Sequence, residues 1–386
     1  MAVGLGLSIG TVNTVSALAE EDSAKAPPGR RSAAERSPAI TRRTTLTFDS
    51  SGMARVGMIP RHGRAITEFA DLGQRNKTKQ ARVGHRALTA ADLIAVVADC
   101  LITEARRDRR AVDAGVTLTH PAGYSEGQVG ELRAALDAIG LRHVALVAEP
   151  VAAATWLEVQ RGPLMPGLAL VYDLGGANLD ITLVRVGAGC PRNPIVGVPV
   201  RSPEFGGRAF GTLVAARGGN GTVPASVSGA VTGITADELR TIHIRSSLKL
   251  VYRCLRMADV TMADVDCVLV VGGAARPVEV SQVLASELAR PVITAPDPER
   301  TIADGAAIMA RRAAAADEEA AGQHHRRRHQ GAHRRATTRA RLLSRRTRRR
   351  LTRVAIATGM SAGGVALALA LPADSVVAGL SQLGLG

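Results

Sequence analysis

The chain contains one short unit twice: a predicted strand, a glycine-rich turn and a second predicted strand. The first unit covers residues 3–19 around a turn at Gly10, and the second covers residues 168–186 around a turn over residues 173–178. In such a turn only glycine lets the backbone approach a phosphate closely enough for successive N–H groups to hold it. Each turn alone also suits an ordinary tight hairpin. Two facing turns, however, would hold a nucleoside triphosphate between two related halves.

Apolar spacing predicts helices and strands in alternation through the rest of the chain. The predicted helices cover residues 88–107 (with Thr89 as N-cap), 125–139, 150–157, 237–256, 278–288 and 298–311, and further strands cover residues 116–119, 144–147 and 267–271. Strands that alternate with helices indicate the α/β class. The length of 386 residues suggests two domains or lobes.

Composition supports a folded chain with aliphatic cores. Hydrophobic residues make up 46% of the sequence, but there are only four Phe, three Tyr and one Trp. The four cysteines, Cys100, Cys190, Cys254 and Cys267, lie far apart without metal-ligand spacing. We therefore expect free thiols in a reducing compartment and no metal framework. No basic residue precedes Lys25, so we expect the N-terminus to be a strand and not a signal peptide.

The net charge of +15 comes mostly from one segment near the C-terminus. Residues 311–353 hold fifteen arginines and three acidic residues, which give +12. Phosphate contacts from this segment would make nucleic-acid binding steeply salt-dependent. The segment has no aromatic residues for base stacking, so we expect nucleic acid not to be a partner.

An uncharged stretch follows the basic segment. Residues 354–371 contain 18 residues without a charge, about 27 Å as a helix, and arginines precede them. This pattern predicts a single membrane-spanning helix with the arginines on the cytoplasmic side against anionic lipids. A glycine- and alanine-rich tail without a fold remains the alternative. Residues 372–386 would be a short tail.

Six motifs resemble the 70-kilodalton heat-shock chaperone family, and they occur in the family's order. Residues 6–14 (GLSIGTVNT) and 171–180 (VYDLGGANLD) are similar to its first and second phosphate motifs, and residues 270–277 (VVGGAARP) to its adenosine motif. The remaining similarities are at residues 119–124 (THPAGY), 148–154 (AEPVAAA) and 304–307 (DGAA). The resemblance covers most of residues 3–311.

The resemblance implies the two-lobed actin-like ATPase fold, which is ribonuclease H-like, with ATP or ADP and Mg²⁺ between the lobes. Lobe I would cover residues 1–157 and lobe II residues 158–312, followed by a basic linker over residues 313–353. Residue by residue, the resemblance implies that the nucleotide is held by Gly10, Thr11, Val12, Gly175, Gly176, Gly272, Gly273 and Arg276. It also implies that Asp173 and Glu149 are catalytic, with Asp173 holding Mg²⁺ through water.

The chain departs from the family at several points. Ser8 stands where the first phosphate motif has Asp, and Ala177 and Asn178 stand where the second has Gly and Thr. We find no counterpart of the family's catalytic lysine near residues 66–75. The stretch between residues 204–207 and the helix at 237 is too short for the family's second-lobe lid, and we expect no peptide-binding domain.

The ordered motifs and the uncharged segment predict a membrane-tethered, nucleotide-binding protein that works through lobe closure at the cytoplasmic face. The departures predict that its ATP hydrolysis is slow or absent. We expect protein partners that the sequence does not identify. The alternative is a scaffold of the same fold that binds protein partners at the membrane without nucleotide.

Overall fold

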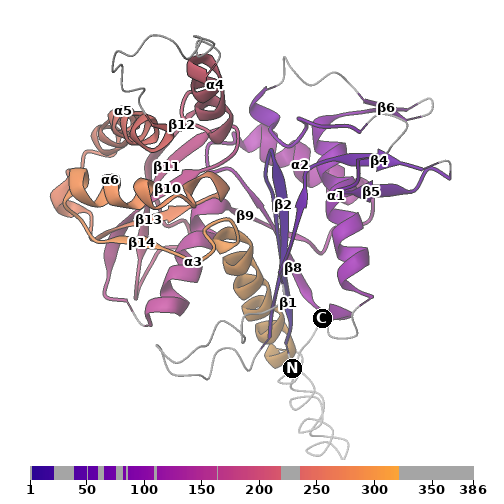
Figure 1. Cartoon of the computed structure of the whole chain (residues 1–386). Coiled ribbons are helices and arrows are strands. Elements are labelled where there is room, and N and C mark those ends of the chain that lie inside the picture. Colours follow the sequence, from indigo (N-terminus) through magenta and orange to yellow (C-terminus); the bar gives the residue numbers. More distant parts are fainter. Residues whose placement is uncertain are drawn as a thin grey trace, which may run out of the picture. The chain divides into compact units, whose positions relative to one another are not determined.

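The computed structural model describes most of the chain up to residue 320 (Figure 1). The described ranges are residues 2–20, 39–49, 51–59, 65–74, 81–83, 86–107, 111–162, 164–218 and 235–320. The predicted membrane helix 354–371, the tail 372–386 and all but the first part of the basic segment lie outside these ranges. Among the described helices, none has both the length and the apolar character needed to cross a membrane.

The described residues build two five-stranded sheets with the same topology. The first sheet has the order β3 (Ala39–Arg43), β2 (Asn13–Ala19), β1 (Gly4–Ile9), β8 (Gly115–His120) and β9 (Ala145–Ala148). The second has the order β12 (Ile195–Ser202), β11 (Leu179–Val186), β10 (Gly167–Leu174), β13 (Cys267–Val271) and β14 (Val292–Thr294). In each sheet the strand before the glycine turn pairs antiparallel with the strand after it and parallel with its other neighbour. The predicted repeat is confirmed at the level of topology.

All the described α-helices except α4 form where the apolar spacing predicts a helix. The described α-helices are α1 (Ala90–Ala105), α2 (Glu126–Ala138), α3 (Glu149–Arg161), α4 (Gly207–Gly218), α5 (Ala236–Met257), α6 (Val278–Leu288) and a last helix over residues 301–320. Capping boxes begin three of them, at Thr89, Ser125 and Thr235, where the side chain accepts a bond from the third backbone N–H of the helix. These local signals explain why the predicted and observed boundaries of these three helices agree closely, whereas α3 and the last helix extend beyond their predicted ends at residues 157 and 311.

Several elements have no counterpart in the prediction. They are α4, the strands β3, β12 and β14, and the small hairpins β4 (Leu46–Phe48) with β5 (Ala54–Val56) and β6 (Ala81–Val83) with β7 (Arg86–Leu88). The hairpin strands have only three residues each, too few to show a period-two pattern. β12 is predominantly accessible along its first half, so its apolar pattern is also weak.

Separate apolar clusters lie on the faces of the two sheets. Leu7 and Leu118 pack with α1 and α2 in the first, whereas Leu170 and Tyr172 pack with α5 and α6 in the second. The other face of the second sheet is covered by α3.

The last helix crosses the first sheet at two glycines. A Cβ at Gly6 would lie 2.1 Å from the carbonyl oxygen of Ala303, and one at Gly4 would lie 2.1 Å from that of Ala307. Figure 1 shows this helix, in yellow-orange, alongside β1. Helix 301–320 thus packs on the first sheet, while α3 packs on the second. The predicted lobe boundaries at residues 157 and 312 stay predictions.

Candidate functional site

A cavity of about 400 Å³ lies between the turn of the first sheet and the turn of the second. Every residue that the family resemblance assigns to the nucleotide or to catalysis lines it: Gly10, Thr11, Val12, Glu149, Asp173, Gly175, Gly176, Gly272, Gly273 and Arg276. These residues span more than 260 positions of sequence. The fold therefore brings the three glycine motifs to one place, although their roles toward a ligand stay predictions.

The two turns are closed by the same hydrogen bond. The N–H of Gly10 donates to the carbonyl of Asn13 at 3.0 Å, and the N–H of Gly175 donates to the carbonyl of Asn178 at 3.0 Å. Counting from these bonds, Ser8 in β1 corresponds to Asp173 in β10 and Val15 in β2 to Asp180 in β11. Ser8 faces Val15 across the first hairpin, and Asp173 faces Asp180 across the second.

Two positions at the cavity require glycine, one at the contact between the two turns and one after β13. A Cβ at Gly176 would lie 2.2 Å from Cγ2 of Val12, on the opposite turn. At Gly272 the backbone φ is +94°, and a Cβ would lie 2.4 Å from Oδ1 of Asp173. A larger residue at either position would clash with these neighbouring atoms. The two glycines therefore allow the chain segments around the cavity to approach each other closely.

The predicted adenosine motif is tied to the loop before the last helix. Arg276 Nη2 contacts Asp297 Oδ1 at 2.9 Å and Glu299 Oε2 at 2.5 Å. Glu299 also accepts a bond from Asn13 Nδ2 at 2.5 Å, which links this loop to the first turn. About half of the Arg276 side chain stays exposed, at 51%, and it lines the cavity.

Three carboxyl groups gather at the second turn: Glu149 at the start of α3, Asp173 in β10 and Asp180 in β11. Burial raises the pKa of Asp173 to about 7, and the negative charge of Asp180 adds to this effect. Burial likewise raises the pKa of Asp180 to about 6, and that of Glu149 rises through burial and the neighbouring Asp173. Such a group of acids favours a bound cation, because the cation stabilises the ionised form of each carboxyl group.

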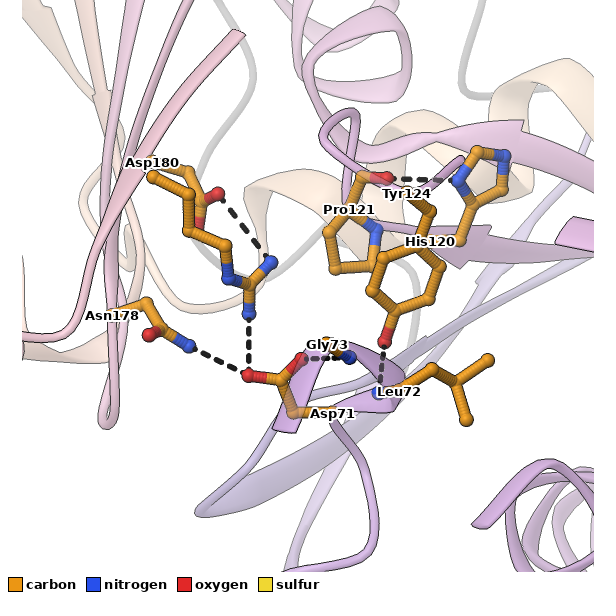
Figure 2. A network of polar contacts seen from close by, with 9 residues as sticks. Asp71, Leu72, Gly73, His120, Pro121, Tyr124, Asn178 and Asp180 are labelled. Carbon is orange, nitrogen blue, oxygen red and sulfur yellow. Dashed lines mark hydrogen bonds and ion pairs between the residues drawn. The ribbon is translucent and has the colours of Figure 1, made fainter. Parts of the chain in front are cut away.

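A polar network joins the second turn to residues that sequence reasoning did not select (Figure 2). Asp71 Oδ2 accepts bonds from Asn178 Nδ2 at 3.1 Å and from Arg201 Nη2 at 3.2 Å. Its Oδ1 accepts the N–H of Gly73 at 2.9 Å. Arg201 Nη1 donates to Asp180 Oδ1 at 3.4 Å. Arg201 therefore connects the carboxylate of Asp71, in the segment before α1, with that of Asp180, in β11 of the second sheet.

The network is braced by a motif that the sequence does show. Asp71 precedes the short 3₁₀ helix η3 (Leu72–Gln74), and the N–H of Leu72 donates to the hydroxyl of Tyr124 at 3.0 Å. Tyr124 ends the motif at residues 119–124, and Pro121 of the same motif lines the cavity. Figure 2 shows Tyr124 pointing at the turn that carries Asp71. Because Leu72 follows Asp71 directly, this contact helps to hold Asp71 in position.

Electrostatics keeps Arg201 charged despite its burial. Burial opposes the charged form, but the carboxylates of Asp180 and Asp71 outweigh it and raise the pKa of the Arg201 guanidinium. Only 23% of the Arg201 side chain is exposed, and 5% of the Asp71 side chain. Breaking a buried pair of this kind leaves an uncompensated charge, which is strongly destabilising.

A second contact closes the rim of the cavity. Arg208, in the first turn of α4, contacts Glu68 Oε1 at 3.0 Å and the carbonyl of Thr11 at 3.4 Å. Glu68 has a φ of +59°, which is uncommon for a residue with a side chain. Both side chains are largely exposed, at 47% and 64%, so water screens this pair.

Some of these residues left a signal in the sequence and some did not. Asp180 and Asn178 belong to the second phosphate motif, and Asp71 lies in residues 66–75, where no counterpart of the family's lysine occurs. That stretch contributes a carboxylate instead. Arg201 has no local signal, because its partner Asp71 is 130 positions away.

Comparison with known proteins supports the predicted resemblance. The family model described as "Hsp70 protein" matches residues 224–319. The chain is 29% identical over 257 residues to the chaperone protein HscA of Serratia proteamaculans, a match that covers 58% of this chain and 41% of the relative. It is 28% identical over 253 residues to HscA of Yersinia pseudotuberculosis, covering 56% and 38%.

A third relative, the HscA homolog of Pseudomonas fluorescens, is 27% identical over 226 residues, covering 51% of this chain and 36% of the relative. The predicted similarity to the heat-shock chaperone family is thus confirmed as that of a divergent, partial relative. The chain spans about two fifths of the length of the curated relatives it matches. The mixed α/β fold, with its two matching sheets, fits an actin-like fold.

Proposed function

We propose that this protein binds ATP or ADP with Mg²⁺ in the cavity between the two glycine turns and responds by closing its lobes. One observation carries the proposal: the three glycine motifs, which span more than 260 positions of sequence, line a single cavity together with the carboxyl groups of Glu149, Asp173 and Asp180. Its volume of about 400 Å³ falls within the range of small-molecule sites. The relatives are named chaperones, so we propose a chaperone-like ATPase that acts on protein partners.

The residues present fit a hydrated magnesium ion. Asp173, Asp180 and Glu149 supply the oxygen ligands that Mg²⁺ prefers, and Mg²⁺ usually keeps several of its waters. Within the described part of the chain, no three acidic, histidine or cysteine side chains converge closely enough to hold a metal directly. Asp173 would therefore hold the ion through water. When bound, Mg²⁺ neutralises charge on the phosphates.

The chain's own residues would position the nucleotide. The backbone N–H groups of Thr11 and Val12 and of the Gly176 turn would hold the phosphates, and Gly273 and Arg276 would bracket the adenosine. Glu149, enclosed at the start of α3, would orient a water molecule. Phosphoryl transfer depends mainly on such positioning and on charge stabilisation.

We propose that hydrolysis is slow or absent. Ser8 places a hydroxyl where the second hairpin has Asp173, so the first hairpin brings no carboxylate to the ion. The segment that would carry the family's lysine carries Asp71. The lid between α4 and α5 would also be reduced, since these helices are separated by only residues 219–235.

Calorimetric titration of the purified full chain with MgATP tests the proposal. We expect binding below millimolar concentration for the unchanged chain and none for Gly176→Val, because the new side chain would overlap Val12. Gly130→Ala is the matched control, since a Cβ there meets nothing within 4 Å. Absence of binding by the unchanged chain at millimolar MgATP would refute the proposal.

We also propose that residues 354–371 anchor the protein in a membrane with the ATPase-like domain on the cytoplasmic side. The support is the uncharged 18-residue stretch behind a run of arginines. Full-length protein should resist both high salt and carbonate, whereas a chain ending at Arg353 should be released by high salt alone. Recovery of the full-length chain in the soluble fraction after a salt wash would contradict the anchor.

A nucleotide-free scaffold remains the second candidate, favoured by one observation. Three direct side-chain contacts join residues 68–71 to the second sheet and α4: Asp71 to Asn178, Asp71 to Arg201, and Glu68 to Arg208. A melting temperature unchanged by either ATP or ADP would favour the scaffold, because a ligand that binds the folded state stabilises it by mass action.

A further inference from the structure

The described residues that line the cavity include three cationic side chains, Arg201, Arg208 and Arg276, and no lysine. Arg276 lies at the adenosine motif and is paired with Asp297 and Glu299. Arg208 lies at the exposed rim. Arg201 is the most enclosed of the three, and it alone is in contact with the carboxyl cluster at the second turn.

The position of Arg201 follows from strand register. Asp173 in β10 faces Asp180 in β11, and Asp180 faces Arg201 in β12. The three residues therefore form a row across adjacent strands, next to the glycines of the second turn. Side chains directly opposite each other on adjacent strands lie within interaction distance. The row places a guanidinium beside the predicted phosphate turn.

Charge at this end of the cavity favours a cation beside a bound phosphate. In their ionised forms, Glu149, Asp173 and Asp180 would each repel a phosphate oxygen, and Asp71 contacts Arg201 next to them. A guanidinium offers several N–H donors in a rigid fork, and Arg201 uses one on each of Asp71 and Asp180. The remaining donors can bind a third anion while both carboxylates keep their contacts.

We propose that Arg201 recognises the terminal phosphate of a nucleoside triphosphate, and that Asp71 is the residue that positions it. This inference rests on the proposed function, because it assumes that a nucleotide occupies the cavity. Asp71 belongs to the segment before α1, whereas Arg201 belongs to the second sheet. The pair thus connects recognition of the terminal phosphate to the contact between the two sheet regions.

The test compares ATP with ADP, because the two nucleotides differ by the terminal phosphate. Calorimetric titration in Mg²⁺ should show that Arg201→Gln weakens ATP binding about 10- to 100-fold, the range for a lost charge-assisted hydrogen bond. ADP affinity should change less than about threefold. Arg201→Lys keeps the charge without the fork, so it should lose only part of the ATP preference.

Asp71→Asn tests the positioning role. It should weaken ATP binding less than Arg201→Gln does and leave ADP binding unchanged. The double variant should bind ATP no more weakly than Arg201→Gln alone, because the two residues act as one unit. A role of Asp71 in folding alone would instead weaken both nucleotides equally, so the ATP-to-ADP ratio separates the two roles.

Arg245→Gln is the matched control, since Arg245 pairs with Glu287 on the surface at 2.8 Å, and neither residue lines the cavity. An equal loss of ATP and ADP affinity in both Arg201 variants, or no loss in either, would overturn the inference. If Arg201→Gln does not fold, the ATP-to-ADP ratio of Arg201→Lys decides. Failure of the unchanged chain to bind either nucleotide is a different result, which would refute the proposed function together with this inference.

Discussion

The two glycine hairpins have the same backbone but different chemistry. β1–β2 and β10–β11 are closed by the same bond at the same distance, 3.0 Å, and each sits next to a parallel strand. At corresponding positions the first hairpin has Ser8 and Val15, and the second has Asp173 and Asp180. The first hairpin therefore offers backbone N–H groups, while the second offers backbone N–H groups and carboxylates.

The hairpins also differ in what packs against them. Gly4 and Gly6 of β1 face the last helix, whereas Ala169 and Val171 hold the corresponding positions of β10 and pack with α3. The same topology thus accommodates a helix against glycines in one half and a helix against larger side chains in the other. The two hairpins therefore share a topology but differ in helix packing and in the carboxylates that they offer. The following predictions test whether these two differences have separate consequences.

The largest expected effect is on the first hairpin's packing. Gly6→Ala should lower the free energy of unfolding by about 3 kcal/mol or more, because the new Cβ would lie 2.1 Å from the carbonyl oxygen of Ala303 and the helix must shift. Chemical denaturation measures this change. Gly130→Ala, at an open position of α2, should stabilise slightly. An unchanged midpoint for Gly6→Ala would show that the helix is not held at this distance.

The second prediction compares the corresponding positions Asp173 and Ser8. Asp173→Ala should lower any MgATP turnover by about 100-fold or more while the fold is kept, because the carboxyl group faces the cavity and not the core. Ser8→Ala should lower it by less than about tenfold, since a hydroxyl carries no charge to the ion. Steady-state phosphate release measures both. Equal effects of the two substitutions would mean that the hairpins share the chemistry evenly.

The third prediction concerns pH and only the second hairpin. Asp173 has a pKa of about 7 in the folded chain against 3.8 for an ordinary aspartate, so the folded state holds a proton that the unfolded state has lost. Without ligand, stability should therefore fall as pH rises from about 5.5 to 8, by about 2 kcal/mol. Mg²⁺ should stabilise more at the higher pH, because it binds the ionised carboxyl.

Thermal unfolding across this pH range, with and without Mg²⁺, measures the effect. Asp173→Asn is the control, since an amide does not titrate and should flatten the part of the slope that Asp173 contributes. A pH slope of the same size in Asp173→Asn would assign the proton to another group, with Asp180 the first to examine because its pKa is raised to about 6.

The smallest effect is expected at the rim, where Arg208 of the second half reaches the first turn. Arg208→Gln should lower the free energy of unfolding by less than about 1 kcal/mol, because both Arg208 and Glu68 are largely exposed. The difference should shrink further in high salt. Denaturation at low and high salt measures it. A loss of several kcal/mol would show that this pair, and not the buried Asp71–Arg201 contact, holds the two halves together.

Local sequence signals predicted the elements that carry their own pattern. The capping box at Thr89 and the apolar spacing behind it placed α1, and the run of buried aliphatic residues placed β13 with the same bounds as observed. The short strands β4 and β6 could not be predicted in this way, because three residues are too few to show a period-two pattern. Strand β12 was missed because its first half is accessible and its apolar pattern is weak, and Arg201 was missed with it.

The sequence by itself determined the repeated strand–turn–strand unit, the alternation of helices and strands, and the residues that line the cavity through the three glycine motifs. These features are encoded locally, in glycine positions, caps and apolar spacing. Only the tertiary structure decided that Asp71 and Arg201, 130 positions apart, meet at the second turn. A contact of this kind depends on strand register and on the approach of two segments that are distant in sequence. The residues next to Asp71 and Arg201 in the sequence therefore contain no pattern that predicts the contact.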